Sequence, residues 1–394
     1  MVLYQVDCFE RNLKFLKFLS IWPDDNPTRC YKYCSKTFIT IFVFLFYILF
    51  TINFFFLPRS MDIFINDMMF FFTDCSVLSK VMTFLLMREK INKILDILES
   101  DIFQPEDPEE KDIVKRAKDF NKLYWKIVAY ISNISNYTNF LPFILHFVKG
   151  TELRFPVCAY SFLTDPLKSM LIYPLYIYQA LGITFHMLYN VNVDTFFLGL
   201  MVLTIAQLEV LDVRLRKVTD VNKLDGGVNE TSNESIDRNK VAVIKINKCI
   251  IHFDEVNRFR SLVEDVFSVT LFVQFSMASC VICVCLMRFT MPAPLDYLFF
   301  LGTYMIAMIL QIIVPCWFGS KIMDKSRQLA FSVYNCDWTT TSRQFKSNMR
   351  LFVERTNKPL TITGGKMFCL SLSAFTSIIN SAYSFFTLLQ QMQD

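Results

Sequence analysis

Residues 171–211 read LIYPLYIYQALGITFHMLYNVNVDTFFLGLMVLTIAQLEVL, an apolar run of unusual length. A helix that crosses a bilayer needs roughly 20 mainly apolar residues. The run could therefore form two short membrane spans, separated at Asn190, Asn192 and Asp194, or one long tilted helix. Hydropathy alone leaves both interpretations open, so the choice depends on the charges that flank the run.

Other apolar runs that are long enough to span a membrane are 36–57, 67–87, 124–148, 266–287, 295–318 and 367–389. Lys and Arg accumulate in the cytoplasmic segments of membrane proteins. If residues 171–211 form one span, most of the 40 Lys and Arg residues lie on the side of the amino terminus. Two spans would move the basic segment 214–260 to the opposite side. We therefore predict an all-α integral membrane protein with seven transmembrane helices, its amino terminus cytoplasmic and its carboxyl terminus extracellular.

The composition agrees with a membrane protein. Hydrophobic residues make up 53% of the chain, and 42 Phe stand against 9 Gly, which is more apolar than an ordinary soluble domain. The net charge of +4 is small and no long basic run occurs, so no nucleic-acid partner is expected. No catalytic or cofactor motif accompanies the three His residues, so we expect neither an enzyme nor a cofactor. Cys280, Cys283 and Cys285 have a metal-like spacing, but they lie in an apolar run and are expected to be packing thiols.

Two amphipathic segments should extend the bundle on the cytoplasmic side. Between Ile246 and Val266, apolar residues recur at helical spacing among charged ones, so the fifth span should continue far below the membrane. A separate short helix should begin near Thr341 or Ser342, and Pro359 should separate it from the last span. Residues 215–240, rich in Gly, Asn and Ser, are expected to form a flexible cytoplasmic loop.

Three charged residues lie inside predicted spans: Asp74, Lys80 and Asp194. Charged side chains are costly in lipid, so they are functional candidates by default. Pairing inside the bundle is an equally good interpretation of each.

The carboxyl-terminal third carries the most specific pattern. Residues Gln311 to Trp338 read QIIVPCWFGSKIMDKSRQLAFSVYNCDW, and Lys358 to Lys366 read KPLTITGGK. The chain then continues with LSL at 370–372, FTSI at 375–378 and YSFFTLL at 383–389. Together these segments resemble the signature of insect odorant receptors over about 80 residues in register. The upstream two-thirds adds only the order of the spans.

The resemblance implies a tetrameric, odour-gated, non-selective cation channel in the plasma membrane of olfactory sensory neuron dendrites. The family divides into a shared co-receptor, which has a long insertion between spans four and five, and many odour-tuning subunits. The short loop here implies a tuning subunit whose partners are a small volatile odorant, the co-receptor and membrane lipid. A gustatory receptor channel of the same superfamily is the nearest alternative, followed by a G-protein-coupled or transporter-like receptor.

The same resemblance assigns different roles to different parts of the chain. Residues 1–214 would be the ligand-binding half, 241–366 would hold spans five and six with cytoplasmic anchor helices, and 367–394 would line the pore. Ser384, Leu388, Gln391 and Met392 share one face of the last helix, with Leu388 and Met392 as an apolar constriction. The alternative is that this face packs on a neighbouring helix.

A subunit contact below the membrane is the second predicted site. Phe345, Met349 and Phe352 are spaced i, i+4, i+7 and so share one helix face. This face and Trp338 present a large apolar area, which we expect another protein surface to cover rather than the cytosol. The alternative is a helix that lies on the lipid surface.

The odorant site is predicted in the extracellular half of the bundle, between spans two, three, four and six. Volatile ligands are small and mostly apolar, so an aromatic cavity with few polar groups should hold them. Two sets share a helix face, and Thr138, Tyr178 and Phe185 are weaker candidates from spans three and four. The two sets are Tyr297, Phe300 and Tyr304 on span six, and Phe70, Thr73 and Asp74 on span two. An aromatic stripe at helical spacing is otherwise typical of core packing.

Overall fold

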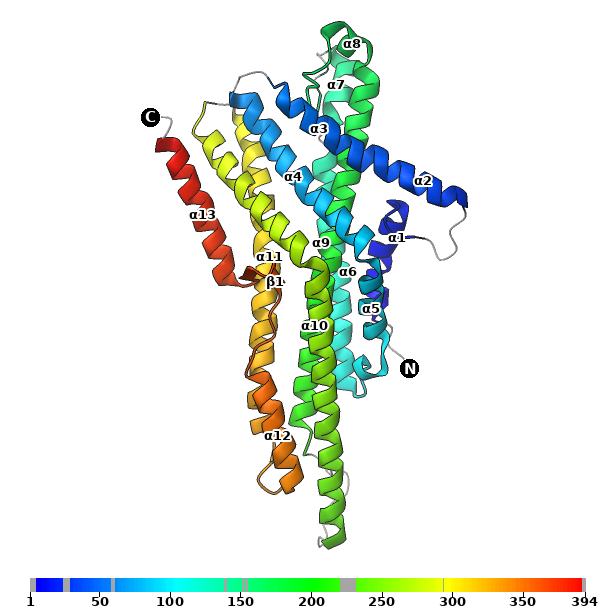
Figure 1. Ribbon diagram of the computed structural model, residues 1–394, viewed down its shortest axis with the longest axis vertical. Helices are drawn as coiled ribbons and strands as arrows, with labels where there is room; N and C mark the ends of the chain where they lie inside the picture. The colour runs from blue at the N-terminus through cyan, green and yellow to red at the C-terminus, as the bar shows by residue number, and fades with distance from the viewer. Residues whose placement is uncertain are drawn as a thin grey trace.

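The computed structural model describes residues 5–23, 29–57, 61–137, 140–150, 153, 155–219, 232–292 and 294–391. The molecule is an elongated bundle of long helices that fans out at the top and narrows below (Figure 1). We call the narrow part, built from α12 and the turns of α9, α10 and α11 beside it, the stem. In chain order the elements are η1 (Val6–Phe9), α1 (Glu10–Phe18), α2 (Arg29–Ile39), η2 (Thr40–Leu45), α3 (Phe46–Phe55), α4 (Met61–Leu86), α5 (Arg88–Glu99), η3 (Asp101–Phe103), α6 (Pro108–Tyr137), α7 (Leu141–Lys149), α8 (Asp165–Met170), α9 (Ile172–Arg216), α10 (Ser232–Phe289), α11 (Leu295–Tyr334), α12 (Arg343–Thr356), β1 (Thr363–Gly364), β2 (Phe368–Cys369) and α13 (Leu372–Gln391).

The long apolar run forms one helix, α9, as the charge distribution predicted. Its polar residues do not interrupt it because their side chains find buried partners. The Asp194 carboxylate lies 2.6 Å from the Lys80 ammonium, and the Asn192 amide oxygen accepts a hydrogen bond of 3.1 Å from the Trp125 indole. A buried polar group costs little when it is hydrogen-bonded. α9 is therefore the buried central helix of the bundle.

The other predicted spans also lie in helices. Among the described residues, six helices are long and apolar enough to cross a membrane. They contain all or most of the predicted spans one, two, four, five, six and seven. The last span begins later than predicted, because Phe368 and Cys369 form β2 and α13 starts at Leu372. The predicted third span, 124–148, is divided between the end of α6 and α7, with residues 138–139 outside the described part of the chain. The chain is a multi-pass membrane protein.

The stem confirms the two helical extensions that periodicity predicted. α10 is 58 residues long and begins at Ser232, inside the segment 215–240 for which a loop was expected; residues 220–231 of that segment lie outside the described residues. α12 begins at Arg343, and the hydroxyl of the preceding Ser342 accepts a hydrogen bond of 3.3 Å from the Phe345 amide. This is an N-cap, because it satisfies an amide that has no partner within the helix.

Arg214, near the lower end of α9, contacts both α6 and α10. The Arg214 guanidinium donates to both Glu110 carboxylate oxygens, at 3.1 and 2.9 Å. It also lies 3.4 Å from Nδ1 of His252, which therefore accepts. The remaining His252 hydrogen, on Nε2, is donated to the Gln207 side-chain oxygen at 3.0 Å. His252 is thus a neutral, fully partnered residue of the stem.

A two-stranded hairpin leads from α12 into α13. β1 and β2 are antiparallel, with Thr363 opposite Cys369. Gly365, at the turn, has φ +59° and donates its amide hydrogen to the Ser268 carbonyl at 2.7 Å. A Cβ at this position would lie 2.9 Å from Phe272, so the hairpin approaches α10 as closely as only glycine allows.

α13 stands apart from the bundle at its carboxyl-terminal end (Figure 1). Ala382 is its one buried side chain within the described residues. Tyr383, Phe385, Leu388 and Leu389 are exposed in the isolated chain. Exposed apolar area on this scale requires lipid or another protein against it.

Candidate functional site

A cavity of about 390 Å³ lies within the upper half of the bundle. Residues of α3, α4, α6, α9 and α11 line it, and Val157 covers it from the connection before α8. The lining comes from the first half of α9 and α11 and the last turns of α6, which places it toward the end that carries α7 and α8 (Figure 1). Its size is that of a site for a small organic ligand.

Five Phe and Tyr rings of the described residues line the cavity, those of Phe46, Phe50, Phe70, Phe300 and Tyr304. Tyr304 of α11 has ring neighbours in Phe300, one turn away at 5.9 Å between centroids, and in Phe70 of α4 at 6.0 Å. The Tyr304 and Thr73 hydroxyls lie 2.5 Å apart and share a hydrogen bond, and the Met69 carbonyl lies 3.0 Å from the Thr73 hydroxyl. Tyr304 is therefore held in place between α4 and α11, with its ring facing the cavity.

A histidine and a carboxyl group supply the most polar point of the cavity. Nε2 of His186 lies 2.9 Å from the Phe42 carbonyl, which can only accept, so this nitrogen carries a hydrogen. Nδ1 lies 2.7 Å from Oδ1 of Asp74, and a contact that short requires a proton between the two groups. The pair is therefore neutral overall. The second Asp74 oxygen, Oδ2, is buried and has no hydrogen-bond partner in the described part of the chain.

Asn190 connects the cavity to the ion pair of Lys80 and Asp194. Asn190 lines the cavity, and its side-chain oxygen accepts a hydrogen bond of 2.5 Å from the Lys80 ammonium. The same ammonium binds Asp194 one turn further along α9. Lys80 is 0% exposed, so Asn190 and Asp194 satisfy a cation that has no access to water.

The structure brings together five of the predicted ligand-site residues in this cavity: Phe70, Thr73, Asp74, Phe300 and Tyr304. Whether they bind a ligand remains a prediction.

Three predicted residues lie outside the cavity, and Thr138 lies outside the described residues. Tyr178 donates to the Ile41 carbonyl at 2.7 Å, and Phe185 packs on Phe38 and Phe42, so both face the first span. Tyr297 lies one turn beyond Phe300, where its hydroxyl bonds to Asn66 and its ring lies 4.9 Å from the Arg288 guanidinium.

Sequence reasoning missed His186 and Asn190 as cavity residues. Both are polar residues in an apolar run, which is the signal that had singled out Asp74. It also missed the contribution of the first span, whose Phe46 and Phe50 line the cavity. No sequence feature shows that α3 crosses α4 and α9 at this level.

The predicted pore residues lie on the exposed part of α13. Leu388 is 53% exposed, and Ser384 is exposed with its hydroxyl bonded to the Asn380 carbonyl at 2.8 Å. Gln391 is the last described residue of the helix, and Met392 lies outside the described residues.

The predicted subunit-contact face packs inside its own chain. Phe345 and Phe352 are 0% exposed and Met349 is 5% exposed. Phe352 meets Phe253 of α10 with 5.6 Å between ring centroids. These three residues therefore hold α12 on the stem, because their side chains reach no other surface. Trp338 is half-buried, and its role in a subunit contact remains a prediction.

Comparison with known proteins gives a consistent picture. The family model described as 7tm Odorant receptor matches residues 60–383. Odorant receptor Or1 of Anopheles gambiae is 23% identical over 404 residues, which cover 98% of this chain and 96% of the relative. Odorant receptor 59a of Drosophila melanogaster is 27% identical over 223 residues, and the chain spans only 55% of its length. The fold matches the insect olfactory receptor OR5 from Machilis hrabei, solved in complex with eugenol, with a TM-score of 0.79 at 16% identity over 98% of both chains.

Proposed function

Because the chain belongs to the insect odorant receptor family, we propose that it is an odour-tuning subunit of an odorant-gated, non-selective cation channel. A small volatile ligand binds in the cavity between α3, α4, α6, α9 and α11. The subunit assembles with the co-receptor in a tetramer, and the α13 helices together line the pore. The amino terminus and the stem lie in the cytoplasm, as the distribution of Lys and Arg favours.

The main support for this proposal is that one chain has both a small cavity lined by aromatic rings and a helix, α13, whose apolar side chains are exposed. The cavity has the volume and the lining expected for a small, mainly apolar ligand. The eugenol bound to the OR5 relative is a compound of this kind, an aromatic ring with one hydroxyl group. The unpartnered Oδ2 of Asp74 gives the cavity an acceptor for such a hydroxyl.

Gating would connect these two parts through α11. Its first half carries Phe300 and Tyr304 in the cavity, and further along Gly319 lies against the Leu370 backbone where the chain enters α13. A ligand that binds one position of α11 better than another shifts the population of open channels by that difference in affinity. α11 would then couple the ligand cavity to the start of α13.

The decisive experiment is voltage clamp of cells that express this chain with the co-receptor while G-protein signalling is blocked. Volatile aromatic and aliphatic alcohols should evoke a cation current that persists under the block. A current that disappears under the block would instead indicate a G-protein-coupled receptor. Cells with the co-receptor alone serve as the control.

Leu388→Cys should make the open channel sensitive to a charged thiol reagent. If Leu388 faces the pore, the attached charge obstructs a narrow apolar passage, and we expect most of the agonist-evoked current to be lost. Phe386→Cys, two residues and about 200° away around the helix, is the matched control. The wild-type chain sets the baseline because Cys30, Cys34 and Cys280 are exposed. Full current in modified Leu388→Cys channels would remove Leu388 from the pore.

A further inference from the structure

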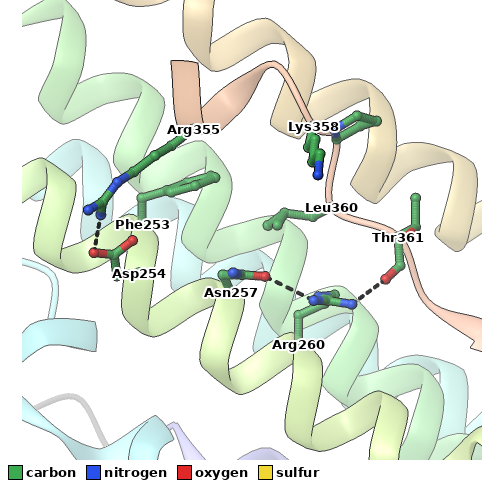
Figure 2. Close-up of a pocket in the computed structure, with 9 residues that line it drawn as sticks. Phe253, Asp254, Asn257, Arg260, Arg355, Lys358, Leu360 and Thr361 are labelled. Carbon is green, nitrogen blue, oxygen red and sulfur yellow. Dashed lines mark hydrogen bonds and ion pairs between the residues drawn. The ribbon is translucent and has the colours of Figure 1, made fainter. Parts of the chain in front are cut away.

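A second cavity, of about 420 Å³, lies in the stem between α10, α12 and the chain that follows α12 (Figure 2). Three cationic side chains line it: Arg260, Arg355 and Lys358. Asp254 is the single carboxylate in its described lining, and this group pairs with Arg355. The cavity therefore has an excess of positive charge that its own walls do not neutralise.

The two other cations have unused binding capacity. Arg260 donates through Nη1 to the Thr361 carbonyl at 2.7 Å and through Nη2 to Asn257 at 2.9 Å, yet its Nε is buried without a hydrogen-bond partner among the described residues. Its ion-pair partner, Glu264, lies outside the cavity lining. Lys358 is exposed and makes no ion pair or hydrogen bond with the described residues. Figure 2 shows Arg260 and Lys358 on the same side of the cavity, whereas the Arg355 guanidinium is turned toward Asp254 on the other side.

A guanidinium and an ammonium group on one side of a cavity, here Arg260 and Lys358, can together bind an anion, and phosphate is an anion that such pairs recognise in proteins. The remaining wall is apolar, with Phe253 and Leu360, and suits the ring or chain that carries a phosphate better than a bare ion. We propose that this cavity binds a phosphomonoester group, which bridges Arg260 of α10 and Lys358 of the segment leading to α13.

Position favours a phosphorylated lipid headgroup as the source, although a soluble phosphomonoester has the same chemistry. Arg260 lies six residues before the start of the predicted fifth span at 266, or about 9 Å along the helix. With the stem in the cytoplasm, as proposed above, the cavity is within reach of the inner leaflet, whose anionic lipids attract basic groups at this depth.

Binding here would act on the base of the pore helix. Arg260 holds the Thr361 carbonyl, and two residues later the Thr363 amide donates to Glu264 at 3.1 Å. Arg260 and Glu264 are themselves paired on one face of α10. An anion that draws Arg260 toward Lys358 therefore acts on the hairpin from which α13 starts.

The test measures binding to the full-length chain purified with the co-receptor. The probes are inositol trisphosphate alone and phosphatidylcholine vesicles with or without phosphatidylinositol bisphosphate. Lys358→Glu, which breaks no contact within the described part of the chain, should weaken binding about ten-fold or more. Arg350→Glu, a charge reversal on the exposed face of α12 outside the cavity, should leave binding within about two-fold of wild type.

The outcomes separate the sources of the ligand. Binding to the bisphosphate-containing vesicles alone identifies a lipid headgroup, whereas equal binding of inositol trisphosphate identifies a soluble phosphate; both support the site. No binding by wild type, or equal losses in the two variants, would overturn it. Because this measurement needs neither odorant nor current, its failure is distinguishable from a failure of the proposed channel function.

Discussion

Lys80→Met should destabilise the folded chain by about 3 kcal/mol, because it removes the fully buried partner of an ion pair whose other side chain, Asp194, is 26% exposed. The Lys80 ammonium is fully buried and lies 2.6 Å from Asp194 and 2.5 Å from Asn190. Methionine fills a similar volume but leaves the Asp194 charge in the bundle without a counterion. The change should lower the thermal unfolding midpoint of the purified protein and reduce the amount at the cell surface.

Two further variants separate the ion pair from a general effect of losing a lysine. The double variant Lys80→Met with Asp194→Leu should recover much of the stability, since an apolar pair often replaces a buried ion pair at little cost. Lys325→Met, at the ion pair with Glu209 whose side chains are 37% and 36% exposed, should cost less than about 1 kcal/mol. A double variant no more stable than Lys80→Met alone would show that the pair is not the cause.

The single long helix α9 and the extension of α10 below the membrane could be predicted because they depend on charge placement and on local patterns. The single helix at 171–211 followed from where Lys and Arg lie, and the extension of α10 followed from the spacing of apolar residues after Ile246. These patterns are properties of one segment at a time. They do not depend on which segment is the neighbour.

The rotation of each helix about its axis could not be predicted in the same way. In α9, the adjacent Phe185 and His186 both contact the first span at Phe42, but only His186 lines the cavity. All sides of this helix are apolar, so periodicity does not distinguish them. The partner of His186 is Asp74, 112 residues away, and only the packed bundle brings them together.

The face of α12 illustrates a related limit. Spacing correctly indicated that Phe345, Met349 and Phe352 share one covered face, but apolar area alone does not identify what covers it. In the structure the cover is α10 of the same chain, because the two helices run side by side in the stem (Figure 1). Any contact between subunits in this region must therefore use other side chains.

Tyr304→Ala and Phe70→Ala should each raise the half-maximal agonist concentration about 10- to 100-fold, with maximal current nearly unchanged. Loss of one ring from a cavity that encloses a small ligand removes about 1–3 kcal/mol of binding free energy. Both rings face the cavity, with 6.0 Å between their centroids. Dose–response curves under voltage clamp, with an agonist of the wild-type channel, measure the shift.

Two matched variants show whether the cavity itself is responsible. Phe185→Ala removes an equally large ring from the same bundle outside the cavity, and should leave the half-maximal concentration within about two-fold when surface expression is equal. Tyr304→Phe keeps the ring but loses the hydroxyl bonded to Thr73, so it separates contact with the ligand from the positioning of the ring. If Tyr304→Ala and Phe70→Ala both give the wild-type curve, the assignment of the odorant site to these rings is wrong.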